Sequence, residues 1–580
     1  MKKLPQIANV GQVRLGQDLY FDAWLYNMMM DNNIAYSINP DIIASPEQMR
    51  FMVATEQEQV YLPCSDATFA LLVQAQCDPK LREQYNRAWR IIMRLVRSFE
   101  PDRKARQRIL ELCRYRFKTQ VLQRPTMIPS RVVKRMTSLA FALSDQVDPW
   151  VSRRREHTRM AHDLLSSPDM RRAINALPAE ILRGDMTDIR QMLNLVELAR
   201  LMFLSMMSRP WLQTPPSPLS LADAFAVGER EAEPLRTLFG AGEGDVKTIL
   251  FLCDADGGVV FDLALISCLM RMGHRVILSL KSGFYFYAPT LDDADTDPTF
   301  KAYLERAHIV RDPALSKNEL LRLLREYRLV VISDGTRERL NLYRTSVTFA
   351  RAWKESDLII AKGWRNAEIL YKTSQHFTRD ILCYWLDREG AYQVRAKARS
   401  LKARKFSEAA LMNMADAIIA GMRDARREGK SVMFYSCIIG SIPGQTSTAI
   451  QLARTFVAHL RGKMDGTYIV NPTEHFADGL DGDDLMFMWE RVQRSGYIDI
   501  WRFQSVQDIE ESFALLERKV PPVWTGKDAT YSTGCTKEMR IALDVQAHNR
   551  EMQIIGPDPE RFFRRNEYGV GKYFDARING

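Results

Sequence analysis

The stretch Thr248-Ile-Leu-Phe-Leu-Cys253 is a short apolar run that leads directly into Asp254-Ala-Asp-Gly-Gly258. Similar apolar runs follow at 275–280, 328–332 and 357–361, and segments with helical spacing of apolar residues lie at 260–272 and 340–353. Strands that are apolar throughout and alternate with helices are typical of a parallel sheet covered on both faces. The sequence therefore predicts an α/β fold, with a three-layer α/β/α, Rossmann-like domain and a mostly parallel sheet over residues 241–392.

The segments on either side of this domain differ from it. Residues 1–240 are predicted to form a mainly helical N-terminal domain, because apolar residues recur there at three- and four-residue steps. Residues 393–580 return to alternating strands and helices and are predicted to be a C-terminal α/β extension. That extension either continues the first sheet or forms a second one. The basic stretch 395–405 is interpreted as a connector.

The composition indicates a folded protein of the cell interior. Of the 580 residues, 46% are hydrophobic and 26% are charged, which is typical of globular chains and excludes a disordered or fibrous class. No stretch reaches the ~20 apolar residues that span a bilayer, so no membrane partner is expected. The eight cysteines show no Cys-x-x-Cys spacing, which favours a reducing compartment. We expect a cytoplasmic location, and the oligomeric state is left open.

Positive charge is concentrated in one part of the chain. Residues 81–160 carry 20 Lys and Arg against 7 Asp and Glu, a net charge of +13, in a chain whose total is +10. Such a segment is compatible with nucleic-acid binding. The arginines alternate with apolar residues at helical spacing, however, and this pattern favours solvated helical faces over a nucleic-acid site.

Polar side chains follow each predicted strand of the central domain. Ligands of parallel sheets bind at the carboxyl ends of the strands, so these positions are the candidate site. Carboxylate and amide oxygens suit hard divalent cations, and lysines suit phosphate oxygens. A single Asp of this kind is as readily a helix cap or a turn residue, but the ordered set favours a metal and phosphate site. The strand-end residues are Asp254, Asp256, Lys281, Asp293, Ser333, Asp334, Lys362, Gly363 and Asn366.

Three of these segments resemble the motifs of one family. The run Asp254-Ala-Asp-Gly-Gly-Val-Val-Phe-Asp262 resembles the Asp-Asn-Ala-Gly-Glu-x-x-x-Asp motif of the damage-control phosphatases, also called acidic-residue-methyltransferase-like proteins. Asp292-Asp-Ala-Asp295, preceded by Lys281, is similar to their Asn-Asp-Ala-Thr. Lys362-Gly-Trp-Arg-Asn-Ala-Glu368 is similar to their Lys-Gly-x-Gly-Asn-x-Glu. The order also agrees, and the resemblance covers roughly 245–385.

The resemblance implies a divalent-metal-dependent phosphatase, a hydrolase of small phosphorylated metabolites such as sugar phosphates. The cofactor would be Mg²⁺, Mn²⁺, Co²⁺ or Ni²⁺. Asp254 and Asp293 would bind this metal, and Lys362 would bind phosphate and complete the catalytic set. The other positions carried over as substrate- or phosphate-binding residues are Lys281, Ser333, Gly363, Asn366 and Glu368.

The sequence departs from the family motifs at three positions. Ala255 stands where the family has its metal-binding Asn, Gly258 replaces the motif Glu, and Arg365 replaces a Gly. Asp256 or Asp334 would then replace the missing metal ligand, or the site would no longer catalyse.

Other functions therefore stay open. One is a non-catalytic anion- or metabolite-binding protein with a degenerate metal site, and less favoured ones are a carboxyl methyltransferase and a nucleic-acid-binding protein. Two geometric expectations also follow. Asp254 and Asp293 should approach each other at one rim of the sheet, and the ammonium of Lys362 should project over the strand ends rather than lie buried.

Overall fold

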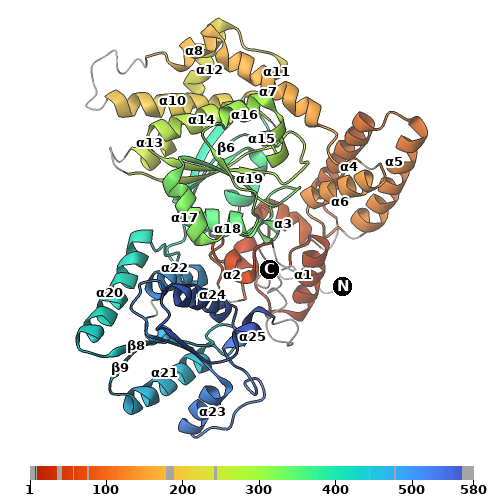
Figure 1. The fold of residues 1–580 in the computed structure, drawn as a ribbon. Helices are drawn as coiled ribbons and strands as arrows, with labels where there is room; N and C mark the ends of the chain where they lie inside the picture. The colour runs from red at the N-terminus through yellow and green to blue at the C-terminus, as the bar shows by residue number, and fades with distance from the viewer. Residues whose placement is uncertain are drawn as a thin grey trace. The chain divides into compact units, whose positions relative to one another are not determined.

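The chain divides into two compact units in the computed structural model, the first ending at Ala403 and the second beginning at Arg404. The structure describes Ile7 and residues 9–35, 42–56, 58–74, 77–123, 125–144, 146–177, 189–240, 245–255, 257–442, 444–475 and 479–564. Each unit contains a sheet with helices packed against it (Figure 1).

The first unit is built on a seven-stranded sheet in the order β3-β4-β2-β1-β5-β6-β7. Its strands are β1 (Thr248–Leu252), β2 (Arg275–Leu280), β3 (His308–Ile309), β4 (Leu329–Ser333), β5 (Leu358–Lys362), β6 (Asp380–Leu386) and β7 (Tyr392–Lys397). All neighbours pair in parallel except β6 and β7, which are antiparallel. The predicted α/β fold with a mostly parallel sheet is confirmed, and four of the strands coincide with the four apolar runs.

Alternate residues of each strand enter two different cores. In β1, Leu250 and Leu252 belong to one core, whereas Ile249 and Phe251 belong to the other, as the two-residue period of a strand requires. The first core is shared with α1 (Leu19–Asp31), α2 (Pro46–Met49), α3 (Asp66–Leu72), α4 (Pro79–Phe99), α5 (Arg103–Phe117), α6 (Pro129–Ala142), α17 (Lys317–Glu326), α18 (Val347–Glu355) and α19 (Trp364–Leu370).

The second core lies against the opposite face of the same sheet. It is shared with α7 (Val151–Ser166), α8 (Pro168–Ile174), α10 (Ile189–Met206), α11 (Ser208–Gln213), α12 (Pro218–Arg230), α13 (Glu233–Phe239), α14 (Val259–Arg271), α15 (Leu291–Thr296) and α16 (Pro298–Tyr303). The helices before residue 240 therefore bury their apolar sides against both faces of the sheet. We expected domain boundaries at 240 and 392, whereas the structure joins these helices to the sheet and divides the chain after Ala403.

The stretch expected to be a basic connector begins as a strand. Arg395 and Lys397 belong to β7, which pairs with β6. Lys397 Nζ donates hydrogen bonds to the carbonyls of Leu370 and Thr373, and burial lowers the pKa of this ammonium to about 8. These charges therefore serve the packing of the sheet edge.

The second unit has a sheet of its own, in the order β11-β10-β8-β9, with all neighbours parallel. Its elements are α20 (Glu408–Arg427), β8 (Ser431–Ser436), α21 (Thr446–Lys463), β9 (Thr467–Val470), α22 (Gly482–Gln493), β10 (Ile500–Phe503), α23 (Val506–Leu515), α24 (Thr533–His548), β11 (Gln553–Ile555) and α25 (Pro559–Phe563). The C-terminal extension is thus a separate α/β unit and does not continue the first sheet.

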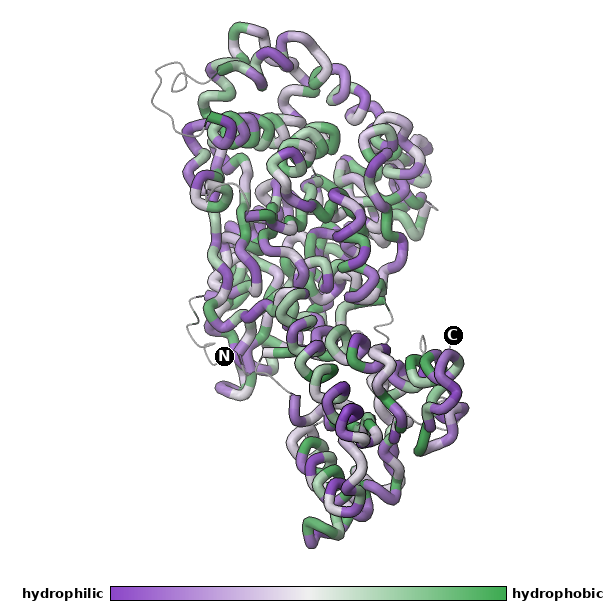
Figure 2. The backbone as a smooth tube through the Cα atoms, turned by 60° about the vertical axis from the view of Figure 1, so that its left-hand side comes forward, coloured by the Kyte–Doolittle hydropathy of each residue, from purple (hydrophilic) through white to green (hydrophobic). Residues whose placement is uncertain are grey.

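Hydrophobic and hydrophilic segments alternate along the backbone of both units (Figure 2). This alternation is what amphipathic helices packed on a sheet require. Across the described ranges, no helix combines the length and the apolar character needed to cross a membrane.

The second unit buries one carboxyl group. Glu538 in α24 accepts a hydrogen bond from Gln493 Nε2 at 3.0 Å. Burial raises the pKa of Glu538 from 4.5 to about 7, because the charged carboxylate loses its hydration.

We expect the stability of the second unit to fall as the pH rises. Between about pH 4.5 and 7 the folded chain holds a proton on Glu538 that the unfolded chain has released. The free energy of unfolding should fall by about 1 kcal/mol per pH unit over this window, and Glu538→Gln should remove the dependence. Thermal unfolding followed from pH 4 to 8 measures it, with Glu510→Gln, at an exposed position of α23, as control. A Glu538→Gln chain that keeps the wild-type pH profile would contradict the assignment.

Candidate active site at the carboxyl edge of the first sheet

The candidate site begins where β1 ends. Asp254 follows this strand, and β1 lies between β2 and β5, so the residues after all three strands emerge at one edge. The Asp254 side chain is buried. Its Oδ1 accepts a hydrogen bond from the Ala255 amide at 2.6 Å and lies 3.4 Å from the guanidinium of Arg365.

Gly363 makes room for Asp254. Its φ is +91°, and a Cβ at this position would lie 1.8 Å from Asp254 Oδ2. In the first turn of α19, three residues after Gly363, Asn366 Nδ2 donates hydrogen bonds to the carbonyls of Cys253 and Lys362. Asn366 therefore ties the loop after β1 to the end of β5, and Gly363 sets how closely the two approach.

Lys362 is completely buried, so the expectation that its ammonium projects over the strand ends is wrong. Its Nζ lies 2.7 Å from Asp262 Oδ1 and donates to the carbonyl of Gly257 at 3.0 Å. Burial raises the pKa of Asp262, and the ammonium beside it opposes this shift. Ser205 Oγ donates a further bond to Asp262. A lysine is tolerated inside the fold because a partner carboxylate satisfies it.

Lys281 and Asp334, from the ends of β2 and β4, form a second buried pair. Lys281 Nζ lies 2.6 Å from Asp334 Oδ2 and also donates to Thr336 Oγ1 and to the carbonyl of Glu338. Ser333 Oγ accepts from the Gly335 amide and so serves the same turn. A cavity of about 20 Å³ is lined by Cys253, Lys281, Asp334 and Asn366, among others, and its size suits a water molecule.

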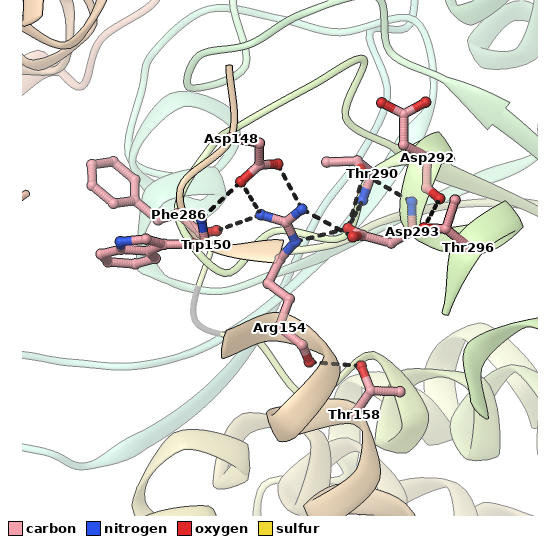
Figure 3. A network of polar contacts seen from close by, with 9 residues as sticks. All are labelled: Asp148, Trp150, Arg154, Thr158, Phe286, Thr290, Asp292, Asp293 and Thr296. Carbon is pink, nitrogen blue, oxygen red and sulfur yellow. Dashed lines mark hydrogen bonds and ion pairs between the residues drawn. The ribbon is translucent and has the colours of Figure 1, made fainter. Parts of the chain in front are cut away.

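Asp293 is held by Arg154 and by its own helix. Its carboxylate caps α15 through the amide and the hydroxyl of Thr290. Arg154 donates to both its oxygens, at 2.8 and 2.9 Å, and the same guanidinium binds Asp148 and the carbonyl of Phe286 (Figure 3). Burial by itself lowers the pKa of Arg154, but its bonds to the two carboxylates raise it on balance.

The loops that carry Asp254 and Asp293 meet through their backbones. The Tyr287 amide donates to the carbonyl of Ala255 at 3.2 Å, and Arg154 contacts the adjacent Phe286. Direct approach of the two carboxylates stays a prediction.

The described residues do not fit a divalent cation in this arrangement. Each strand-end carboxylate has a basic partner: Asp254 with Arg365, Asp293 with Arg154, and Asp334 with Lys281. A hard cation needs several oxygen ligands at once. Within the part of the chain that the structure describes, no group of three or more His, Cys, Asp or Glu residues is placed to hold a metal ion. Asp256, the expected substitute ligand, lies outside the described residues.

A cleft of about 760 Å³, which we call the arginine cleft, includes Ala255 in its lining. Arg339, Arg365 and Arg388 line it from segments that follow strands, and Arg87, Arg94, Arg153 and Arg209 line it from helices. Glu368 also lines it, as expected of a substrate rim, and is bound by Arg339 at 3.0 Å.

The sequence interpretation missed most of this cleft. Arg87, Arg94 and Arg153 come from the basic segment that we interpreted as solvated helical faces. Trp150 and the run Tyr285–Tyr287 also line the cleft. The sequence did contain one indication of this cleft, the aromatic run 284–287. It lies between Lys281, the predicted strand-end lysine, and Asp293, the predicted metal ligand.

We expect Lys362→Met to lower the free energy of unfolding at neutral pH by about 3–5 kcal/mol, because Asp262 would be left as a buried charge without its partner. Adding Asp262→Leu should recover much of the loss, since no charge is then buried. Urea unfolding of the three chains measures the effect. A single variant as stable as the wild type would show that the pair is not what holds these elements together.

We expect Gly363→Ala to displace the Asp254 carboxylate and to destabilise the chain more than backbone strain alone. Gly273→Ala is the matched control, because Gly273 has a φ of +100° and no heavy atom within 4 Å of the added Cβ. Strain at such a φ costs about 1–3 kcal/mol, and the contact with Asp254 should add to it. Equal losses of melting temperature in the two variants would argue against a close approach at Gly363.

Three comparisons relate this chain to known proteins. The structure of a DUF89 family protein from Pyrococcus horikoshii is similar, with 19% identity and a TM-score of 0.37 over 54% of this chain and 96% of that chain. None of the curated proteins matches the sequence. The family model of the damage-control phosphatase ARMT1-like domain matches residues 70–404, more than half of the chain. The predicted family is thereby confirmed, and the chain belongs to the damage-control phosphatase ARMT1-like domain family.

Proposed function

We propose that this chain binds small phosphorylated metabolites in the arginine cleft beside Asp254. The observation that carries the proposal is the charge of the cleft, whose lining includes seven arginines and two acidic residues. Guanidinium groups are planar multiple donors that match phosphate oxygens. Membership of a phosphatase family supports the same ligand class.

Binding is the function that the geometry supports best, because the carboxylates at the strand ends are already paired with Arg365, Arg154 and Lys281. A second candidate is the metal-dependent hydrolysis of small phosphoesters such as sugar phosphates. It is favoured by the family and by Asp254 and Asp293, which occupy the motif positions of the metal ligands. That candidate requires both carboxylates to exchange an arginine for Mg²⁺, Mn²⁺, Co²⁺ or Ni²⁺.

A cytoplasmic location is also proposed. All eight cysteines are free thiols in the structure, which suits a reducing compartment.

We expect the full chain to bind ribose 5-phosphate in the presence of EDTA, as measured by calorimetry. Arg365→Ala should weaken this binding at least about tenfold, ~1.4 kcal/mol, through loss of a charge-assisted contact. Arg82→Ala, at an exposed position of α4 outside the lining of the cleft, should leave binding unchanged.

A phosphate-release assay with the four metals separates the two candidates. Turnover that depends on both a metal and Asp254 would replace the binding proposal with the hydrolytic one. If no phosphate ester binds or turns over, both are wrong.

A further inference from the structure

We propose that a groove between helices α4 and α5 binds single-stranded RNA, with phosphates on its arginines and a base on Trp89. Helices α4 and α5 follow each other in the chain and pack against one another and against α6 (Figure 1). Between them lies a groove of about 820 Å³, which we call the α4–α5 groove. It is a different surface from the arginine cleft, and its function is independent of the one proposed for that cleft.

Helix α4 contributes different faces to the two surfaces. Trp89, Met93 and Arg97, which are four residues apart, line the α4–α5 groove. Arg87 and Ile91, also four residues apart, line the arginine cleft. An α-helix makes one turn in 3.6 residues, so positions 89 and 91 differ by about 200° around its axis. The two stripes therefore point in nearly opposite directions, and a ligand in one surface leaves the other open.

One face of α5 forms the opposite wall of the groove. Its lining residues recur at three- and four-residue steps and include Arg103, Arg106, Leu110 and Arg114. From position 103 to position 114 the helix rises by about 16 Å. A stacked strand of nucleic acid carries one phosphate for about every 3.4 Å of its length. This row of arginines can therefore contact several successive phosphates.

The arginines of the groove are not engaged by the protein's own acids. Within the described part of the chain, none of the four, which are Arg97 and the three of α5, has a carboxylate partner. The lining contains one acid, Glu111, which accepts a hydrogen bond from Gln107 at 2.8 Å. Four arginines against one glutamate leave positive charge in excess. Guanidinium groups that have no ion pair to give up present several donors in a fixed plane to phosphate oxygens.

Positive charge continues around the groove. Residues 79–118 carry thirteen Lys and Arg against four Asp and Glu, a net charge of +9 in a chain whose total is +10. Lys104, Arg108 and Arg116 of α5 are exposed outside the lining. The rims of the groove would be sufficient for an acidic peptide helix. Charge that extends beyond the rims creates a long-range field, which favours an extended polyanion.

Trp89 supplies an aromatic surface in the same groove. Its side chain is only partly buried, and its ring lies 5.4 Å from that of the buried Phe117, measured between centroids, which holds it in place. A charged groove with an aromatic platform is how proteins bind single strands, since unpaired bases are free to stack on a ring. Bases of a duplex are already stacked. RNA is the nucleic acid that proteins recognise chiefly through its unpaired segments.

Fluorescence anisotropy of a labelled oligouridine of about 15 nucleotides, titrated with the full chain, tests the proposal. The dissociation constant is measured in EDTA from about 50 to 200 mM salt. We expect its logarithm to rise with the logarithm of the salt concentration with a slope of about 3, because each phosphate contact contributes about 0.7. A duplex of the same length should compete at least about tenfold less well, and ribose 5-phosphate should not displace the RNA.

Matched variants locate the site. Changing both Arg103 and Arg114 to Gln should weaken RNA binding at least about tenfold and lower the salt slope by about 1.4. Changing both Arg108 and Arg116 to Gln alters the net charge equally on the same helix but outside the groove, and should weaken binding less than about threefold. All four side chains are exposed, so both double variants should fold, which circular dichroism checks. Trp89→Leu should weaken binding further than Trp89→Phe, which keeps an aromatic ring.

Several results would overturn the proposal. Equal effects of the two double variants would show non-specific attraction to the whole segment, and displacement by ribose 5-phosphate would place the RNA in the arginine cleft. Displacement by polyglutamate at equal charge would point to an acidic protein partner, and oligothymidine that binds at least about tenfold more tightly than oligouridine would point to single-stranded DNA. Absence of oligouridine binding would remove the proposal and leave the function proposed for the arginine cleft untouched.

Discussion

The buried pair of Lys362 and Asp262 connects the elements on which the site depends. It joins the last residue of β5 to α14, and the same ammonium binds the carbonyl of Gly257 in the loop between β1 and α14. Both side chains are almost completely removed from solvent. Two charges that lose their hydration are tolerated only when each compensates the other, so the position of one element determines the position of the other. The loop that carries Asp254 is thereby held against the start of α19.

Pairing of opposite charges also determines what the strand-end carboxylates can do. A carboxylate that accepts two bonds from a guanidinium, as Asp293 does from Arg154, has its charge neutralised by a group that belongs to the protein. A divalent cation would have to displace that group and also find further oxygen ligands. Ala255 supplies no side-chain oxygen at the position where the motif that it resembles has an Asn. This pairing is the electrostatic basis of the anion binding proposed at this edge, in a chain that belongs to a phosphatase family.

The arginine cleft shows how a helical segment becomes part of a site on a sheet. Helices α4 and α6 contribute to the first core and, together with α19, line the cleft. Their apolar sides pack inward, and Arg87 and Arg94 of α4 are left in the lining of the cleft. An arginine that would only be solvated on an isolated helix comes to line a cleft once the helix packs beside a sheet edge.

The sequence alone determined the local features of this protein. Short-range apolar periodicity predicted β1, β2, β4 and β5, and the order of polar residues after these strands was sufficient to recognise the family. It did not predict β6 and β7, or that helices before residue 240 cover both faces of one sheet. The pairing of Arg154 with Asp293 joins residues 139 positions apart, and that of Lys362 with Asp262 joins residues 100 apart. Only the tertiary structure decided which charges meet and which are buried, because a side chain's electrostatic partners depend on packing between distant elements, whereas periodicity reports only neighbours along the chain.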